Sequence, residues 1–439
     1  MSAQSLKYTG IIIIILIIYI KGICHANAPA IEIPGSFNPV GSGARAMGMG
    51  GAFMGIADDA TASSWNPGAL IHLKQPEFSI VFSHDRLTEI NSFGKLPDAF
   101  DEKSLESQKI NYLSAALPLN VFNKNMVIAV SAQRLYELSR NWEFNYHTQD
   151  EIESMDAHYT YEQTGDLYAI GLSWCMELIQ PKLSFGVTLN RWGDGLFGDD
   201  WKRQYHMSAN GVYDTPYLEN ESRTIGYSFE GLNVTMGMVW EVHDQWRLGA
   251  VFKSPFNAEI HQTSWSNYFH SDTGHRPVSA KKQSLTLEMP LTYGLGILYR
   301  CHDNLYLAAD IYETHWQHFV FQTPGGQTCP LSGHPRSEFQ LDRTYQMRLG
   351  GEYVWTDPIK RRLIPIRMGL FYDPMPSDDH GDDIFGFSLG TGWTLMDQFS
   401  IDLAYQFRFG NDVGEHYLSN MDFSQDIRES KIYFSLILY

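Results

Sequence analysis

From residue 76 to its last residue, the chain alternates apolar and polar residues with a period of two. In LSFGVTLN, which begins at Leu183, apolar residues at odd positions alternate with Ser, Gly, Thr and Asn. From Phe399 to Phe409, every odd position is apolar. A period of two sends successive side chains to opposite faces of a strand. The pattern therefore predicts an all-β chain whose strands each have one apolar face.

Fourteen segments carry this pattern, and the connections between them alternate between long and short. A tilted strand crosses a bilayer with about 9–11 residues, which many of these segments reach. Barrels of the outer membrane have an even number of strands, short periplasmic turns and long outer loops. We therefore predict a 14-stranded antiparallel transmembrane β-barrel built from the segments near 76–84, 107–118, 125–137, 165–176, 182–192, 225–240, 246–254, 283–299, 304–316, 344–355, 363–373, 384–395, 398–410 and 430–439.

The phase of the apolar positions gives three further predictions. Segment 225–240 changes phase between Phe229 and Leu232, which predicts a β-bulge at Glu230–Gly231. Segment 283–299 keeps one phase, which is expected to face lipid with Leu285, Leu287, Met289, Leu291, Tyr293, Leu295 and Ile297. Near the periplasmic strand ends, an interfacial tryptophan girdle is predicted from Trp174, Trp240, Trp246, Trp355 and Trp393.

Residues 1–28 have the features of a secretory signal peptide. Lys7 precedes the apolar run Ile11–Ile20, and Ala26-Asn27-Ala28 forms an A-x-A cleavage site. The apolar run is too short to cross a bilayer as a helix, which takes about 20 residues. We expect export through a cleaved signal peptide, followed by insertion into the bacterial outer membrane.

Between this leader and the first strand lies a segment rich in Gly, Ala and Met. It reads GSGARAMGMGGAFMGIADDATASSWNPGAL from Gly41 to Leu70. Glycine permits unusual turns and methionine fills irregular gaps. A 14-stranded barrel has a lumen too wide for its wall side chains to fill. We therefore predict a hatch, or plug, at 29–75 inside the barrel at 76–439, containing Arg45, Met47, Met49, Phe53, Met54, Trp65, Asn66 and Pro67.

Several charged residues share the inward phase of the predicted strands. Because both signs occur, we expect them to pair with one another and to tie the wall to the hatch. The alternative is that one cation, Lys253 or Arg45, binds a ligand carboxylate. The inward charges are Arg247, Lys253, Glu288, Asp310, Arg348, Glu352, Arg367, Asp402 and Arg408.

The net charge of −18 argues against nucleic acid as a partner, because nucleic acid requires a basic surface. The chain has no G-x-S-x-G, H-E-x-x-H or C-x-x-C motif. The acidic loop Ser377–Asp383 matches no defined metal site, and we interpret it as solvated. We therefore expect no enzymatic activity, no cofactor and no metal.

The whole chain resembles the long-chain fatty acid transporter family of the outer membrane, the FadL/TodX type. The resemblance rests on GARAMGMGGAFMGIADDATASSWNPGAL, on LEMPLTYGLGILYR, NLYLAADIYETHW and YQMRLGGEY, and on IPIRMGLFYDPMP. It departs from the family at WNPGAL, where two small residues are exchanged. It implies a 14-stranded barrel closed by a hatch. It also implies passive uptake of long-chain fatty acids or aromatic hydrocarbons, with lateral release through the wall. The family has a kink in its third strand, but segment 125–137 has no Gly or Pro to predict one.

Two long outer loops are rich in large apolar residues, which tend to mark binding surfaces. In the family this region captures the ligand, and the alternative is that the loops pack on each other. The residues expected to bind ligand are Leu196, Phe197, Trp201, Tyr205, Met207, Tyr213, Phe256, Trp265, Tyr268, Phe269 and Lys253.

The partners expected from this interpretation are a hydrophobic small molecule, outer-membrane lipid and lipopolysaccharide. A different class of function stays open at this point. The barrel could serve as a platform or shuttle for a secretion or assembly system, with a secreted or periplasmic protein as its partner.

Overall fold

The computed structural model describes residues 33–34, 36–94, 96, 99–149, 153–196, 200–323, 325–338, 340–357, 362–377, 382–395, 398–415 and 422–439. The predicted signal peptide, 1–28, and the start of the predicted hatch, 29–32, lie outside the described residues. Within the described part of the chain, no helix is long and apolar enough to cross a membrane.

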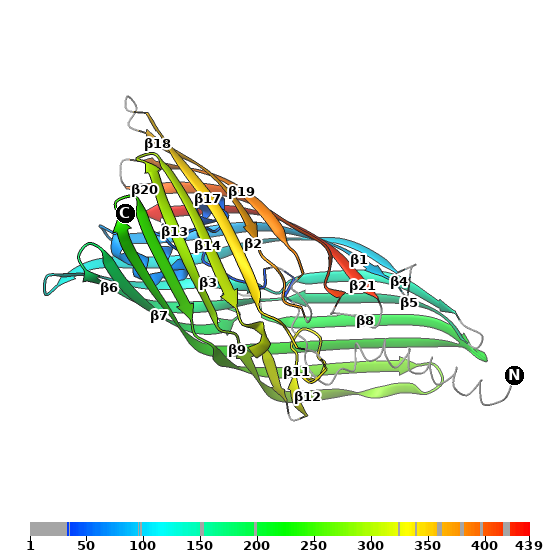
Figure 1. The fold of residues 1–439 in the computed structure, drawn as a ribbon. Coiled ribbons are helices and arrows are strands. Elements are labelled where there is room, and N and C mark those ends of the chain that lie inside the picture. The colour runs from blue at the N-terminus through cyan, green and yellow to red at the C-terminus, as the bar shows by residue number, and fades with distance from the viewer. Residues whose placement is uncertain are drawn as a thin grey trace.

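Fourteen strands form a closed antiparallel barrel (Figure 1), as predicted from the alternation. Each strand pairs with the next in the series, and β21 pairs with β1 to close the ring. Every predicted segment overlaps one wall strand. In order, these are β1 (Glu77–Phe93), β2 (Phe100–Val121), β3 (Lys124–Glu137), β6 (Asp166–Ile179), β7 (Leu183–Asp194), β9 (Thr215–His243), β10 (Trp246–Lys253), β13 (Thr292–His302), β14 (Leu305–Thr314), β17 (Thr344–Asp357), β18 (Arg362–Tyr372), β19 (Phe385–Leu395), β20 (Phe399–Val413) and β21 (Phe423–Leu438).

The wall has an apolar outer belt and a polar, small-sided inner face. On β20, Leu403 is 47% exposed, whereas its neighbours Asp402 and Ala404 are buried. All five tryptophans of the predicted girdle are exposed on the outward face. The belt therefore has the surface that hydrocarbon requires.

Further strands extend one side of the wall outward, where the sequence pattern suggested only loops. They are β4 (Arg140–Gln149), β5 (Glu153–Thr164), β8 (Lys202–Tyr213), β11 (Phe256–His270) and β12 (Gly274–Met289). Both β8 and β11 pair with the outer half of β9, β5 pairs with β8 and β4, and β12 pairs with β11. We call these strands, with the outer half of β9, the outer sheet (Figure 1). Two short strands, β15 (Val320–Thr323) and β16 (Gly326–Thr328), extend it from β12.

The predicted bulge at Glu230–Gly231 is wrong. Strand β9 passes this point without a register shift, and its odd residues face inward throughout. The apolar face changes instead: Leu232 is 60% exposed in the lipid belt, whereas Tyr227 and Phe229 are buried inside the outer sheet. The phase change therefore marks the level at which the wall leaves the membrane.

The extra residue lies on the neighbouring strand. Lys253 pairs with Thr235, and Glu259 pairs with Glu230. Between these two pairs, the β10–β11 side has six residue steps whereas β9 has five. The interruption falls at Ser254–Pro255, between β10 and β11. A proline has no N–H for the ladder, which explains the break at this position.

The predicted lipid-facing segment 283–299 is also corrected. Strand β12 ends at Met289 and β13 begins at Thr292, because Pro290 interrupts the ladder. The residues that face inward have odd numbers before this break and even numbers after it. Leu285, Leu287 and Met289 are buried inside, whereas Tyr293 and Leu295 face outward as predicted.

Inside the barrel, the segment before β1 forms three short helices, α2 (Ala44–Gly48), α3 (Ala62–Trp65) and the 3₁₀ helix η1 (Pro67–His72). Asn66 caps η1, because its side chain accepts a hydrogen bond from the Gly68 N–H. A further 3₁₀ turn, η2 (Trp316–His318), follows β14. We call the segment from Val40 to Leu73 the hatch; most of its side chains are buried.

Candidate functional site

The hatch fits into the barrel because inward-facing wall positions are glycines. A Cβ atom at Gly186 would lie 2.3 Å from the Pro67 carbonyl carbon, and one at Gly369 would lie 2.2 Å from the Gly50 nitrogen. These distances are too short for any larger residue to occupy the position unless the hatch shifts. The same close approach occurs at Gly237, Gly249, Gly350 and Gly390.

Ion pairs also anchor the hatch to the wall. The Arg45 guanidinium donates to both carboxylate oxygens of Glu352, at 3.0 and 2.9 Å, and pairs with Asp58 within the hatch. Arg367 donates to Glu352 and to Asp402, each at 2.5 Å. Arg45 is therefore engaged by carboxylates of the protein and is a poor candidate for binding a ligand acid.

Hydrogen bonds to backbone groups complete the anchoring. Asp310 accepts from the N–H groups of Phe53 and Met54, at 2.8 and 2.9 Å. Arg348 donates to the Gly50 carbonyl at 3.0 Å, and the Asn66 amide donates to the Met54 and Met238 carbonyls. The other hatch residues predicted from the sequence, namely Met47, Met49, Trp65 and Pro67, are buried.

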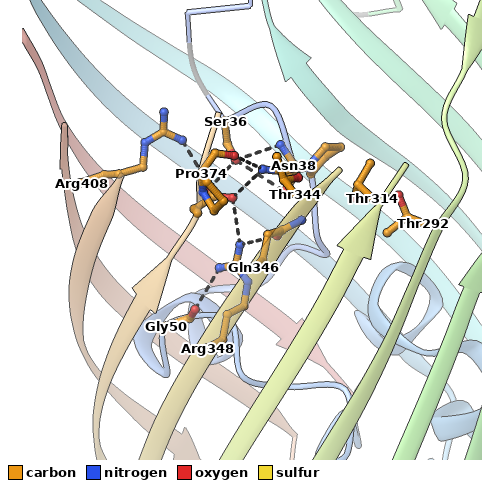
Figure 2. Close-up of polar contacts among 12 residues, drawn as sticks. Ser36, Asn38, Gly50, Thr292, Thr314, Thr344, Gln346, Arg348, Pro374 and Arg408 are labelled. Atoms are coloured by element: carbon orange, nitrogen blue, oxygen red, sulfur yellow. Dashed lines mark hydrogen bonds and ion pairs between the residues drawn. The ribbon is translucent and has the colours of Figure 1, made fainter. Parts of the chain in front are cut away.

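Next to the hatch, residues Ser36–Val40 form a strap across the lumen. Ser36 and Asn38 both donate to Asp373, at 2.7 and 3.0 Å, and Asn38 also donates to the Pro374 carbonyl (Figure 2). The Trp316 indole N–H donates to the side-chain amide oxygen of Asn38, Oδ1, at 3.2 Å. These contacts hold the strap between the β14 and β18 sides of the wall.

On one side of the strap lies a cavity lined by both aromatic and polar side chains. The Phe37 and Trp316 rings meet edge to face at 6.0 Å, and Trp192 packs on Phe256 at 5.1 Å. The lining also includes Tyr136, Met289 and Tyr312, together with polar side chains such as Asn190, Asn233 and Gln346. We call this the aromatic cavity. A cavity that combines aromatic rings with hydrogen-bonding groups suits a small molecule that has an apolar part and a polar group.

Lys253 is the one cation that lines the aromatic cavity among the described residues. Its ammonium donates to the Pro39 carbonyl of the strap at 3.1 Å. Within the described part of the chain, no carboxylate forms an ion pair with Lys253. A half-buried charge without a charged partner is costly, so this position suits an anionic ligand.

On the other side of the strap lies a second cavity with charged walls. Its lining includes Arg134, Glu137, Arg348, Asp373, Arg408, Glu429 and Lys431. Acids and bases pair here, for example Arg134 with Asp85 at 2.6 Å. The two cavities share Asn38, Pro39, Gln133 and Leu135 as lining residues. Movement of the strap would therefore join them.

The wall beside this charged cavity is interrupted. The β2–β3 ladder ends at Tyr112↔Gln133, although both strands continue outward. Register shifts flank the end point, leaving Asn111 unmatched on β2 and Leu135 unmatched on β3. The charged cavity reaches this point, because Asn111 also lines it.

Beyond the end of the ladder, side chains link β2 to the neighbouring strands. Ser107 donates to Glu137 at 2.6 Å, and Lys109 pairs with Asp166 at 3.0 Å. Ile110 at this level is the register partner of Phe82, which is 41% exposed in the lipid belt. The interruption therefore lies at the outer part of the belt. A bulge requires neither Gly nor Pro, which is why the sequence of β3 did not predict it.

The residues expected to capture ligand do not form one site. Phe256 and Lys253 line the aromatic cavity. Trp201 stacks on Tyr227 at 4.3 Å inside the outer sheet, and Met207 and Tyr205 lie on the same inner face. Tyr268 and Phe269 are half-buried near the end of β11, whereas Leu196, Tyr213 and Trp265 are exposed. Phe197 lies outside the described residues.

The sequence analysis missed most of the aromatic lining, including Phe37, Trp192, Tyr312 and Trp316. A signal was available for Trp192, because it shares the inward phase of Ser184 and Thr188. A large aromatic residue on the polar phase at the outer end of a strand points into the lumen. Phe37 and Trp316 lie outside the wall strands and gave no such signal.

Within the described residues, no group of three or more His, Cys, Asp or Glu side chains could hold a metal ion.

Comparison with known proteins gives one family and one fold. The model of the family described as outer membrane protein transport protein (OMPP1/FadL/TodX) matches residues 26–425. A search of curated proteins finds no match.

Three solved structures are similar to this chain over nearly its whole length. A FadL homologue from Pseudomonas aeruginosa aligns with a TM-score of 0.64 at 14% identity, covering 92% of this chain and 99% of its own. The CymD monoaromatic hydrocarbon channel has a TM-score of 0.58 at 14% identity, covering 92% and 98%. The Pseudomonas putida toluene transporter TodX has a TM-score of 0.53 at 14% identity, covering 92% and 99%. At these identities the likeness shows the fold.

Proposed function

Because the chain belongs to the OMPP1/FadL/TodX family of outer membrane transport proteins, we propose that it is a passive channel for hydrophobic small molecules. The hatch blocks the lumen, so a solute cannot diffuse through an open water-filled pore. The aromatic cavity offers an apolar solute a site inside the lumen. Two structurally similar proteins are named for aromatic hydrocarbons or toluene, which agrees with a hydrophobic substrate.

The preferred substrate is an acid with a long apolar tail. The observation that carries this choice is Lys253, a half-buried cation on the aromatic cavity whose hydrogen-bond acceptor is an uncharged carbonyl. A ligand carboxylate would replace that bond with a stronger one in which both donor and acceptor are charged. An aromatic hydrocarbon would leave the ammonium without an anionic partner.

The same hydrogen bond couples binding to passage. Lys253 holds Pro39 of the strap, and Gln133 donates to the neighbouring Val40 carbonyl at 3.2 Å. When a ligand carboxylate binds the Lys253 ammonium in place of the Pro39 carbonyl, the strap loses one of the hydrogen bonds that hold it. The aromatic cavity then opens toward the charged cavity and the interruption between β2 and β3. The apolar tail leaves sideways into the bilayer without crossing water.

The test compares an acid with its uncharged analogue. Hexadecanoic acid and hexadecane are titrated against the purified protein in detergent, with displacement of a fluorescent fatty acid as the readout. Loss of a hydrogen bond to a charged group costs about 1.5–3 kcal/mol, so Lys253→Met is expected to weaken acid binding about 10- to 100-fold. Hexadecane binding should change little.

Lys202→Met is the matched control, because Lys202 is an exposed lysine on the outer sheet. It should leave both affinities unchanged. Unchanged binding of the acid by Lys253→Met would contradict the assignment of the acid as substrate.

The alternative role, a platform for a secretion or assembly system, predicts a different co-purifying molecule. Mass spectrometry of molecules that co-purify with the detergent-extracted protein distinguishes the two roles. An apolar acid supports the channel, whereas a stoichiometric polypeptide without apolar ligand supports the platform.

A further inference from the structure

The outward face of the outer sheet carries an exposed tryptophan that the lumen does not use. Trp265 on β11 is 45% exposed, and its register partners are Thr224 on β9 and Ala280 on β12. Part of the ring lies over Gly226, since a Cβ at that position would be 3.9 Å from the ring. The ring therefore rests on a position without a side chain and is partly open to solvent.

Polar side chains surround this ring on the same face. Gln204 donates to Thr224 at 3.4 Å, and His206 and Thr263 lie one register step away. Hydroxyl, amide and imidazole groups both donate and accept hydrogen bonds. An exposed indole within such a surface suits a sugar ring, whose C–H face packs on the aromatic plane while its hydroxyl groups bond to the rim.

We infer that this face, centred on Trp265, binds the phosphorylated oligosaccharide of lipopolysaccharide. The face continues the lipid belt along β9, whose outward residues change from Leu232 in the belt to Thr224 beside Trp265. Eight residues separate these positions, which is about 26 Å along the strand at about 3.3 Å per residue. For a strand tilted by about 40°, Trp265 then lies about 20 Å above Leu232 along the membrane normal, on the side where the outer leaflet presents sugars.

Two lysines on the face match the phosphate groups of this ligand. Lys202 is the register partner of Gly226 and Lys282 that of Thr263, so both point outward beside Trp265. Both are exposed, although the whole chain carries a net charge of −18. The contact would fix the protein in its leaflet and hold the outer sheet upright. This role is independent of the aromatic cavity.

The test titrates phosphorylated core oligosaccharide, freed of lipid, against the full-length mature protein in detergent. Trp265→Ser should weaken binding at least about tenfold. Trp355→Ser is the matched control, because Trp355 is 48% exposed but lies at the opposite end of the barrel. It should bind as the unchanged protein does.

Lys282→Gln and a dephosphorylated oligosaccharide provide the second arm, and each should lower the affinity. Equal binding of a neutral glucan, or an unchanged affinity of Trp265→Ser, would overturn the inference. Displacement of the fluorescent fatty acid is measured on the same variants. It should not change, so failure of this inference is distinguishable from failure of the proposed channel.

Discussion

At the scale of single residues, two kinds of side chain define the lumen. Lys253 places a positive charge beside aromatic rings, and in the proposed channel it selects an acid as the ligand. Inward-facing glycines such as Gly350 and Gly369 leave the space that the hatch backbone occupies inside the barrel. Sequence analysis placed Lys253 on the inward phase, but it could not decide whether a carboxylate of the protein already paired with it. That depends on contacts between segments far apart in the chain.

Gly350→Ala is expected to unseat the hatch, because its Cβ would lie 2.4 Å from the Met49 carbonyl oxygen. Single-channel recording in planar bilayers should show an open-channel conductance that the unchanged protein lacks. Gly351→Ala is the control, since its nearest neighbour would be the Leu307 side chain at 3.4 Å. If both variants stay closed, the glycine contacts do not determine the seating of the hatch.

Glu352→Gln tests the ion-pair anchor. The substitution leaves Arg45 and Arg367 without their shared carboxylate inside the lumen, and breaking a buried pair costs about 3–5 kcal/mol. We expect faster proteolysis of the hatch by an added protease, measured by mass spectrometry of the fragments. Exchange of the exposed acid Glu162 for Gln should not change the rate. Equal rates for all three proteins would contradict the anchoring role.

At the scale of elements, the membrane made the strands predictable. Lipid on one face and a polar lumen on the other impose a strict alternation, so all fourteen wall segments were recognised. The outer sheet was not predicted because its strands lie outside the membrane, where the large apolar residues face inward instead of outward. Tyr227 and Phe229 are buried inside, whereas Leu232 on the same strand faces lipid. In the sequence, this change of the apolar face suggested a bulge in β9. A similar change between β12 and β13, at Pro290, was not recognised.

The interruption between β2 and β3 is the element that transport depends on in this account. Ser107→Cys with Glu137→Cys, joined by a short reducible bis-thiosulfonate linker, places a crosslink across it, where Ser107 Oγ lies 2.6 Å from Glu137 Oε1. In the crosslinked form we expect ligand to bind but not to leave. The measurement is transfer of a fluorescent fatty acid from loaded protein to vesicles, with reduction restoring the rate.

A second cysteine pair, Ala115→Cys with Val130→Cys, serves as the control. These residues are register partners within the paired part of the same ladder, and both face outward. The same crosslink there leaves the interruption open, so transfer should continue. Transfer by the crosslinked Ser107/Glu137 variant at the normal rate would place the exit elsewhere.

At the scale of the whole molecule, three layers have separate tasks. The belt places the protein in the membrane, the hatch and strap close the lumen, and the outer sheet extends from one end of the barrel (Figure 1). The belt exposes many large apolar side chains, among them Leu295, Met368 and Leu370, each more than 60% exposed. The mature protein should therefore be monodisperse only in detergent or lipid. A monodisperse species in plain buffer, observed by light scattering, would refute the membrane assignment.

The central claim is that a hydrophobic acid occupies the lumen with its carboxylate on Lys253. The most direct measurement is a crystal structure with 2-bromohexadecanoic acid, whose bromine next to the carboxylate is located by anomalous scattering. The account predicts bromine inside the aromatic cavity, near Trp192 and Phe256, with the carboxylate on the Lys253 ammonium in place of the Pro39 carbonyl. Bromine confined to the lipid belt, with the Lys253–Pro39 bond intact, would contradict it.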